Sequence, residues 1–249
     1  RMTQKVLITG ASRGIGRATA RQLGALGASV GINYRANRAA AESAADEVRG
    51  AGGQAVLLPG NVSREEQVVS MFAECVKSFG ALDGVVINAG VVAPGSKLAD
   101  MTGERMRDLI ELNVLGALYC AREAARLLSR SRGGSGGSIV FVSSAASRLG
   151  APGEYVDYAA SKGALDSLTI GLSKELGREG VRVNAVRPGL IDTEIHATSG
   201  RADRAQVLGP ETPIGRAGTA DEVAEAIVWL LSDAASYVTG SFLDVAGGR

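Results

Sequence analysis

The sequence predicts an α/β fold: one domain built on a doubly wound parallel sheet of about seven strands, with helices on both faces. Short apolar runs alternate with longer helical patterns along the whole chain, which is typical of this architecture. The apolar runs lack the two-residue alternation of half-exposed strands, as expected for strands buried on both faces. No proline-rich or low-complexity linker interrupts the 249 residues. We therefore expect a single domain over residues 2–249, with Arg1 set aside as an addition made for expression.

Each expected element follows from its own stretch of sequence. Ser63 is expected to cap the third helix, because its hydroxyl can accept a hydrogen bond from the first turn. The expected strands are KVLIT (5–9), ASVGINY (28–34), QAVLLPG (54–60), LDGVVINAG (82–90), SIVFVS (138–143), VRVNAVRPG (181–189) and SFLDVAGG (241–248). The expected helices cover about 17–27, 37–52, 63–80, 103–130, 154–178 and 220–233.

Charge and composition restrict the function. The 27 Lys and Arg nearly balance the 26 Asp and Glu, so we expect no basic field that would bind nucleic acid or an anionic membrane. No apolar run reaches the ~18–20 residues of a membrane span, and we expect no signal peptide. Cys75 and Cys120 form no disulfide framework or metal spacing, and His196 is the single histidine. We therefore expect no metal site and a location in the reducing cytoplasm.

A glycine-rich turn, TGASRGIG (9–16), lies between the first strand and the first helix. Its glycines, Gly10, Gly14 and Gly16, match neither the P-loop nor the usual G-x-G-x-x-G fingerprint. They would still allow a tight turn and a close approach of the backbone to a pyrophosphate, which would lie at the positive end of the helix. A tight strand-to-helix junction without a ligand is the alternative at this stage.

The end of the second strand bears on the choice between NAD and NADP. A carboxylate at this place would bind a ribose 2′-hydroxyl and repel a 2′-phosphate. The sequence instead has Tyr34 followed by Arg35, and Arg13 lies in the glycine-rich turn. Guanidinium groups suit a doubly charged phosphate. NADP(H) is therefore favoured, while NAD(H) stays open, as does the interpretation of both arginines as ordinary surface residues.

The stretch YAASK (158–162) places Tyr158 and Lys162 on one face of a helix, because residues four apart are neighbours. An ordinary surface pair would fit this spacing as well. Polar and turn residues also follow three other strands, and the carboxyl ends of parallel strands meet at one edge of the sheet. These residues are Asn88, Ala89 and Gly90, then Ser143 and Ser144, and finally Pro188, Gly189 and Thr193. Their expected convergence favours an active site over a surface pair.

With these motifs the chain resembles the short-chain dehydrogenase/reductase family over essentially its whole length, which implies a Rossmann-like fold. The matching pieces are TGxxxGxG at 9–16, NAG at 88–90, Asn113 in ELNVLG, Ser144, Y-x-x-x-K at 158–162 and RPG with Thr193 at 187–193. One departure is that Ser144 precedes Tyr158 by one residue more than in the family, so Ser143 stays a weaker candidate for the serine. A second is Asn61, where the family often has Asp beside the adenine; Asn can still donate and accept.

The resemblance implies hydride exchange between a nicotinamide and a carbonyl or secondary alcohol carbon, with Tyr158 as proton donor and acceptor. A free phenol titrates near pH ~10, and an ammonium about 4 Å away contributes ~4 kcal/mol at an effective dielectric of ~20. We therefore expect Lys162 to lower the pKa of Tyr158 by ~2–3 units almost alone. The resemblance also assigns ribose binding to Lys162, substrate orientation to Ser144 and a proton-relaying water to Asn113. A helix kink or a solvent-facing side chain is the alternative for Asn113.

The expected site residues form two groups. The catalytic group is Asn113, Ser144, Tyr158 and Lys162. The residues expected to bind the cofactor are Gly10, Ser12, Arg13, Gly14, Ile15, Gly16, Tyr34, Arg35, Asn61, Val62, Asn88, Ala89, Gly90, Tyr158, Lys162, Pro188, Gly189, Ile191 and Thr193.

The leading hypothesis is an NADP(H)-dependent oxidoreductase acting on a small carbonyl or secondary alcohol compound. A 3-oxoacyl thioester and a sugar or polyol compete as substrates. The alternative from another class is a regulatory protein that binds NADP(H) without turnover. The family resemblance implies a homotetramer, with a dimer second. The polar stretch 194–212 is expected to form a lid over the substrate, with its His196 as a surface residue.

Overall fold

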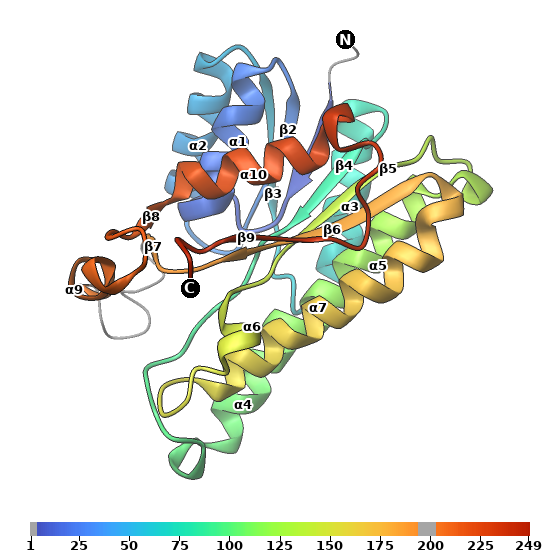
Figure 1. The fold of residues 1–249 in the computed structure, drawn as a ribbon. Helices are drawn as coiled ribbons and strands as arrows, with labels where there is room; N and C mark the ends of the chain where they lie inside the picture. The colour runs from blue at the N-terminus through green and yellow to red at the C-terminus, as the bar shows by residue number, and fades with distance from the viewer. Residues whose placement is uncertain (1–3, 194–202) are drawn as a thin grey trace.

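The computed structural model describes residues 4–193 and 203–249 (Figure 1). Its seven-stranded sheet is parallel throughout, in the order β3-β2-β1-β4-β5-β6-β9. The chain enters at β1, winds out to β3 and returns to the other side of β1 at β4, so the predicted doubly wound sheet is confirmed. The strands are β1 (Lys5–Ile8), β2 (Ser29–Tyr34), β3 (Gln54–Pro59), β4 (Gly84–Ile87), β5 (Gly137–Val142), β6 (Val181–Pro188) and β9 (Phe242–Val245).

Helices cover both faces of this sheet. The helices that pack on it are α1 (Gly14–Ala25), α2 (Arg38–Gly50), α3 (Glu65–Phe79), α5 (Gly116–Leu128), α7 (Val156–Leu176) and α10 (Ala220–Leu231). Shorter helices are α4 (Gly103–Ile110), α6 (Ala146–Leu149) and α9 (Arg204–Leu208). Single turns are η1 (Leu98–Asp100), η2 (Glu111–Leu115), η3 (Arg130–Arg132), η4 (Gly177–Glu179), η5 (Gly209–Glu211) and η6 (Asp233–Ala235).

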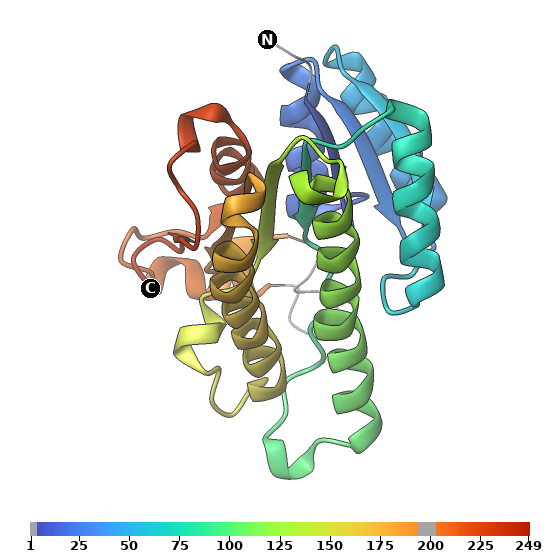
Figure 2. The same cartoon turned by 90° about the vertical axis from the view of Figure 1, so that its right-hand side faces the viewer.

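The molecule has three layers, with the sheet in the middle (Figures 1 and 2). Buried residues of α1, α2 and α10 form one core cluster with Val6 and Ile8 of β1. Leu7 of the same strand belongs to the second cluster, together with α3, α5 and α7. Successive side chains of one strand thus enter opposite cores. Because both faces are covered, all six residues of β2 are buried, which explains the missing alternation in the sequence.

The prediction of one continuous helix over 103–130 is wrong at the centre of this range. The chain forms α4, then the π-helical turn η2, and then α5. A π turn widens the helix by one residue, and such turns occur often at functional sites. Here the wide turn contains Asn113, whose exposure is 1%. Asn113 therefore does not face solvent, and it lies in an irregular turn between two α-helices.

The start of α3 also differs from expectation. The predicted cap Ser63 lies outside the helix, whose N-cap is Arg64. The side-chain oxygen of Asn61 accepts hydrogen bonds from the backbone N–H and the hydroxyl of Ser63, at 3.1 and 2.9 Å. Ser63 therefore serves as a donor in a turn of the loop after β3. Two short strands, β7 (Ile191–Asp192) and β8 (Gly218–Thr219), pair in parallel and were not expected from the sequence.

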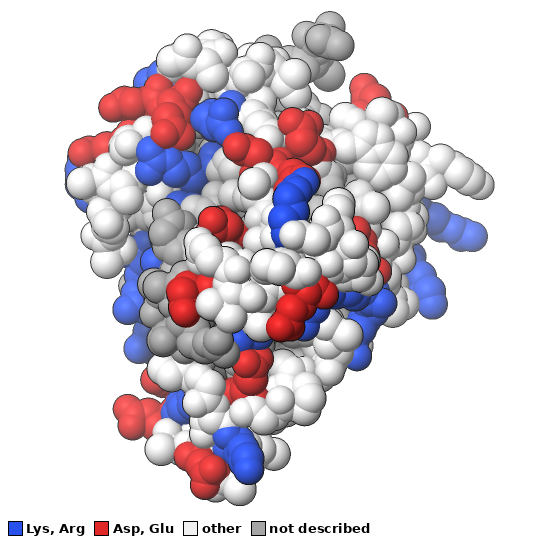
Figure 3. All heavy atoms as spheres, turned by 60° about the vertical axis from the view of Figure 1, so that its left-hand side comes forward, with Lys and Arg blue, Asp and Glu red and all other residues white. Residues whose placement is uncertain are grey.

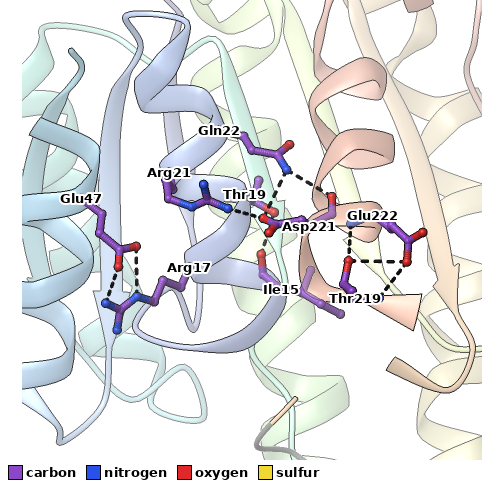
Figure 4. A network of polar contacts seen from close by, with 9 residues as sticks. All are labelled: Ile15, Arg17, Thr19, Arg21, Gln22, Glu47, Thr219, Asp221 and Glu222. Atoms are coloured by element: carbon purple, nitrogen blue, oxygen red, sulfur yellow. Dashed lines mark hydrogen bonds and ion pairs between the residues drawn. The ribbon is translucent and has the colours of Figure 1, made fainter. Parts of the chain in front are cut away.

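Polar contacts fix α1 between α2 and α10 (Figure 4). Arg17 pairs with Glu47 of α2 at 2.6 Å, while Arg21 and Gln22 both bind Asp221 in the first turn of α10. Such partly exposed pairs each contribute less than about 1 kcal/mol, so their effect is mainly on orientation. Since α1 follows the glycine-rich turn directly, its orientation determines where the amino-terminal end of the helix points.

Charges of both signs are mixed over the face shown in Figure 3, with no large area of one sign. This distribution matches the near balance of 27 basic and 26 acidic residues. Within residues 4–193 and 203–249, no helix has the length and apolar character needed to cross a membrane.

Candidate active site

A cavity of about 890 Å³ runs along the carboxyl ends of the strands, on both sides of the point where the strand order reverses. Its walls come from the segments that follow β1 to β6, so the convergence expected from the sequence occurs. Every predicted site residue lines this cavity except Gly16 and Asn113. Both of these are buried behind its wall, Gly16 in the first turn of α1 and Asn113 behind Gly90.

The glycine-rich turn has the shape of a cradle for a diphosphate. Gly10 and Gly14 have positive φ angles of 63° and 52°, a conformation that favours glycine. A Cβ atom on Gly16 would lie 2.5 Å from the carbonyl oxygen of Gly10, so only glycine fits there. The N-cap of α1, Arg13, is extended and its side chain caps no N–H group. The first N–H groups of α1 are thus available to an anion, and the residues fit a dinucleotide.

The NAG segment is tied directly to this turn. The side-chain amide of Asn88 donates hydrogen bonds to the carbonyl oxygens of Thr9 and Gly10, at 2.9 and 3.0 Å. In return, the hydroxyl oxygen of Thr9 accepts the backbone N–H groups of Asn88 and Ala89, both at 2.9 Å. The loops after β1 and β4 therefore form one unit at the centre of the cavity.

Two arginines border the end of the cavity beside β2. Arg13 and Arg35 are exposed and line the cavity. Their neighbour Arg38 forms an ion pair with Glu42, whereas the ion pairs within the described ranges include neither Arg13 nor Arg35. Both guanidinium groups are thus free to bind a phosphate. Tyr34 differs from the exposed Arg35 that follows it. It is only 6% exposed and belongs to the core cluster under α1 and α2.

The chemical groups lie at the opposite end, on α7 and the loop after β5. Lys162 lies one turn after Tyr158, with its Nζ atom 5.6 Å from the centre of the Tyr158 ring. Ser144 forms a side-chain hydrogen bond with Tyr158. The hydroxyl of Ser143 instead lies near the carbonyl oxygen of Lys162, at 3.2 Å, and Asp166, at 2.7 Å. Of the two serine candidates, Ser144 is the one beside the phenol.

The interval between Ser144 and Tyr158 is one residue longer than expected, and a loop between α6 and α7 accommodates this extra residue. After α6, Gly150, Ala151 and Gly153 all have positive φ angles, of 76°, 46° and 75°. Among the residues that the structure describes, Ala151 alone takes up this conformation without being glycine. The segment turns sharply and takes up chain length before α7 begins, which leaves the contact between Ser144 and Tyr158 intact.

Lys162 and Asn113 are held from behind the cavity. Lys162 is 4% exposed, and its ammonium donates to the carbonyl oxygen of Val142 at 2.8 Å. The Asn113 amide accepts from the N–H of Val91 and donates to the carbonyl oxygen of Val91 and to Ser161. A Cβ atom on Gly90 would lie 3.4 Å from both the Asn113 oxygen and the Lys162 nitrogen. Gly90 thus leaves a narrow space between these two polar groups.

The electrostatics of the chemical end contradict one expectation. Burial raises the pKa of Tyr158 to about 12, although the hydrogen bond with Ser144 opposes the rise. Burial also lowers the pKa of Lys162 to about 8, with Asp166 opposing. The prediction that Lys162 lowers the pKa of the Tyr158 phenol almost alone is therefore wrong for the protein without a bound cofactor. Burial is the largest cause of both shifts, because removing a charge from water is costly, and neither group is among the causes of the other's shift.

Several cavity residues had no signal in the sequence. Glu154 and Tyr155 precede Tyr158, and Arg204 of α9 joins Glu154 through two hydrogen bonds of 2.8 and 2.7 Å. This ion pair joins segments 50 positions apart, so no local pattern could reveal it. Of the stretch expected to form a lid, 203–212 contains α9 and η5, whereas 194–202, with His196, lies outside the described residues.

Comparison with known proteins gives matches along nearly the whole chain. The model of a family described as "Enoyl-(Acyl carrier protein) reductase" matches residues 10–249. The oxidoreductase YgfF of Escherichia coli (strain K12) is 51% identical over 243 residues, which are 98% of this chain and 98% of YgfF. The 3-oxoacyl-[acyl-carrier-protein] reductase FabG of Staphylococcus aureus is 34% identical over 248 residues, with 100% of this chain and 98% of FabG covered.

Solved structures agree with these matches. The crystal structure of a short-chain type dehydrogenase/reductase from Mycobacterium marinum superposes with a TM-score of 0.92 at 34% sequence identity. The superposition covers 98% of this chain and 94% of that one. The overall fold is therefore shared over nearly the whole of both chains.

Proposed function

The chain belongs to the short-chain dehydrogenase/reductase family, and from this premise we propose that it is an NADP(H)-dependent enzyme acting through Ser144, Tyr158 and Lys162. Membership makes it an oxidoreductase that transfers a hydride to or from a carbonyl or alcohol carbon. The cofactor, the residue roles and a single dinucleotide-binding and catalytic domain over 2–249 are parts of the proposal. The observation that carries it is one cavity with a diphosphate cradle at one end and a serine–tyrosine–lysine group at the other.

The three residues can divide the proton chemistry between them. Bound nicotinamide supplies or accepts the hydride. Ser144 would hold the substrate oxygen beside the phenol, and Tyr158 would give its proton to that oxygen as the carbonyl is reduced. With a pKa raised to about 12, the phenol keeps its proton at neutral pH, which suits it as a donor. Lys162 would bind the nicotinamide ribose, and Asn113 would hold a water that returns protons towards Lys162.

The preference for NADP(H) is supported by Arg13 and Arg35. Both line the cavity beside β2, where a 2′-phosphate would lie, and no carboxylate follows Tyr34 in the sequence. The test compares Arg35→Ser with Arg38→Ser, whose side chain already pairs with Glu42. In the first variant, kcat/KM for NADPH relative to NADH should fall about tenfold or more, because a charge-assisted contact is lost. An unchanged ratio would exclude Arg35 from cofactor selection.

The substrate class is sorted by one panel. Loss of NADPH absorbance should be followed with ketones and 3-oxoacyl thioesters, and formation of NADPH from NADP⁺ should be followed with sugars or polyols in the reverse direction. The name of the Staphylococcus aureus relative assigns a 3-oxoacyl thioester to that protein, so this class enters the panel beside the sugars. Turnover of any class supports an enzyme. Tight NADPH binding without turnover of any class would favour a regulatory protein.

Assembly and location complete the proposal. Large apolar side chains are exposed on α5 and α7, among them Leu118 and Ile170, and others lie on α10 and β9, namely Trp229 and Leu243. Two separate apolar surfaces support a homotetramer with two kinds of contact, and a dimer would use one of them. Light scattering distinguishes the homotetramer from the dimer.

The proposed location is the reducing cytoplasm. Cys75 and Cys120 are free and buried, which supports this location.

A further inference from the structure

Asn33 is a buried polar side chain at the end of β2, next to the nucleotide end of the cavity. It is 2% exposed and lines the cavity. Its Oδ1 atom accepts the backbone N–H of Gly10 at 3.1 Å. Its Nδ2 atom donates to the carbonyl oxygens of Leu58 and Gly60, both at 3.0 Å. One side chain thus satisfies backbone groups of two neighbouring segments, each on a different side of β2.

These contacts join the three segments that form the nucleotide end. Gly10 is the first glycine of the glycine-rich turn, Gly60 precedes Asn61, and Asn33 itself precedes Tyr34 and Arg35. The backbone of β2 adds two more links, because the Asn33 carbonyl accepts Ala11 N–H at 2.8 Å and the Tyr34 carbonyl accepts Gly60 N–H at 2.9 Å. Gly10 is held on both sides, since Asn88 donates to its carbonyl oxygen.

A second buried asparagine supplies the comparison. Asn184 of β6 is 0% exposed, and its side chain also bonds only backbone groups, donating to Val238 at 2.9 Å and accepting from Ser241 at 3.0 Å. Asparagine is unfavourable in strands, so each position needs such bonds to be tolerated. Asn184, however, does not line the cavity. The two residues share burial and chemistry and differ in the segments that they hold.

We propose that Asn33 is a positioning residue for the nucleotide half of the cofactor, which sets the spacing between the glycine-rich turn and the loop after β3. The inference rests on the proposed use of a dinucleotide and adds a residue that contacts the protein backbone around it. Its amide is needed in full, because one oxygen must accept and one nitrogen must donate twice.

The variant Asn33→Asp tests this requirement with almost no change in shape. One oxygen of the introduced carboxyl group still accepts Gly10 N–H, but the other faces the carbonyl oxygens of Leu58 and Gly60. When ionised, it repels both, and the loop after β3 should move away. When protonated, it can donate to one of them. Burial and this repulsion should raise the pKa of the introduced group. The charged side chains on the glycine-rich turn and directly after β2 are Arg13 and Arg35.

The experiment measures NADP⁺ binding by calorimetry for wild type, Asn33→Asp and the control Asn184→Asp. At about pH 8 the dissociation constant should rise about tenfold to hundredfold for Asn33→Asp and less than about twofold for the control. The ratio of variant to wild type should shrink as the pH is lowered to about 5.5. Division by the wild-type value removes the titration of the cofactor itself. Equal affinities for both variants would overturn the inference.

A second measurement tests the inference even if Asn33→Asp fails to fold. Asn33→Ala and Asn184→Ala are compared by hydrogen exchange without cofactor. Faster exchange confined to peptides covering 9–16 and 59–63 is expected for Asn33→Ala, and exchange no faster than in Asn184→Ala would contradict the inference. Failure of the proposed function has a different signature, because wild type itself would then bind neither NADP⁺ nor NAD⁺.

Discussion

The two ends of the cavity are built by different means. At the nucleotide end, glycines and the amides of Asn33 and Asn88 hold backbone segments at fixed distances, through neutral hydrogen bonds. At the chemical end, Lys162 is buried and Tyr158 is half-buried, and the pKa of each is displaced to disfavour its charged form. The first end depends on shape and the second on charge. Substitutions that displace the backbone segments at the nucleotide end should therefore affect binding, and those that remove a titratable group at the chemical end should affect turnover.

The largest effect is expected at the chemical end, for Tyr158→Phe. The ring keeps its edge-to-face contact with Tyr155, at 5.8 Å, but the proton donor is lost. Turnover should fall at least about a hundredfold, while NADP⁺ affinity changes less than about twofold. Steady-state kinetics and calorimetry check both values, and Tyr155→Phe is the control for loss of a hydroxyl on the same wall. Undiminished turnover in Tyr158→Phe would remove the proposed mechanism.

Lys162→Met separates charge from stability. The pKa of Lys162 falls from 10.5 in the unfolded chain to about 8 in the fold, so the unfolded state binds its proton more tightly. Below pH 8 this difference costs about 3 kcal/mol of folding free energy, and the cost disappears as the pH rises to 10.5. The Lys162→Met variant also loses the hydrogen bond to the Val142 carbonyl oxygen, which takes about 1 kcal/mol from the stability gained by removing the buried ammonium.

The Lys162→Met variant, which we expect to be inactive, should thus be more stable than wild type by about 2 kcal/mol at pH 7. This gain should shrink between pH 8 and pH 10.5, where wild-type Lys162 becomes less costly. Denaturant unfolding of both proteins over this range is the measurement. A variant that is less stable at neutral pH would mean that the ammonium is better solvated than its burial indicates.

Gly16→Ala tests shape at the nucleotide end. The added Cβ atom would lie 2.5 Å from the Gly10 carbonyl oxygen and 2.7 Å from the Asn88 amide nitrogen, so the turn must shift. The dissociation constant of NADP⁺ should rise about tenfold or more, in line with the cost of overpacking. Calorimetry measures it. Wild-type affinity in this variant would show that the turn adapts and that shape is not decisive there.

Gly90→Ala is the matched change at the chemical end, and its effect should be the smallest. Its Cβ atom would lie 3.4 Å from both the Asn113 oxygen and the Lys162 nitrogen, which is a tolerable contact. NADP⁺ affinity should stay near the wild-type value. Turnover should fall only a few-fold, because the methyl group crowds the space between two polar groups without changing a charge. A larger loss of affinity than in Gly16→Ala would reverse the contrast between the two ends.

The sequence allowed the sheet, the helical layers and the edge that carries the cavity to be predicted. These depend on patterns within short stretches, such as the glycines of 9–16 and the spacing of Tyr158 and Lys162. The π turn around Asn113 could not be predicted, because it is stabilised by contacts with Val91 and Ser161, which lie 22 and 48 positions away. The same holds for Asn33, whose partners come from two other segments.

The pKa shifts are the clearest limit of prediction from sequence. The spacing of Tyr158 and Lys162 indicates that the two groups are neighbours, and they are. The spacing does not reveal how far both groups are removed from water. This removal from water raises the pKa of the phenol, whereas the sequence predicted a lowered pKa. The assigned roles of Asn113, Ser144, Tyr158 and Lys162 stay predictions until the variants are measured.

The central claim is that the fold holds Tyr158 protonated, and we expect the positive charge of a bound oxidised nicotinamide to favour its ionisation. Tyrosine ring carbons labelled with ¹³C report the titration of all five tyrosines, and Tyr158→Phe identifies the signal. The pKa of Tyr158 should lie near 12 in the protein alone and fall by about 2 units or more with NADP⁺ bound. A pKa near 10 that NADP⁺ leaves unchanged would contradict the account.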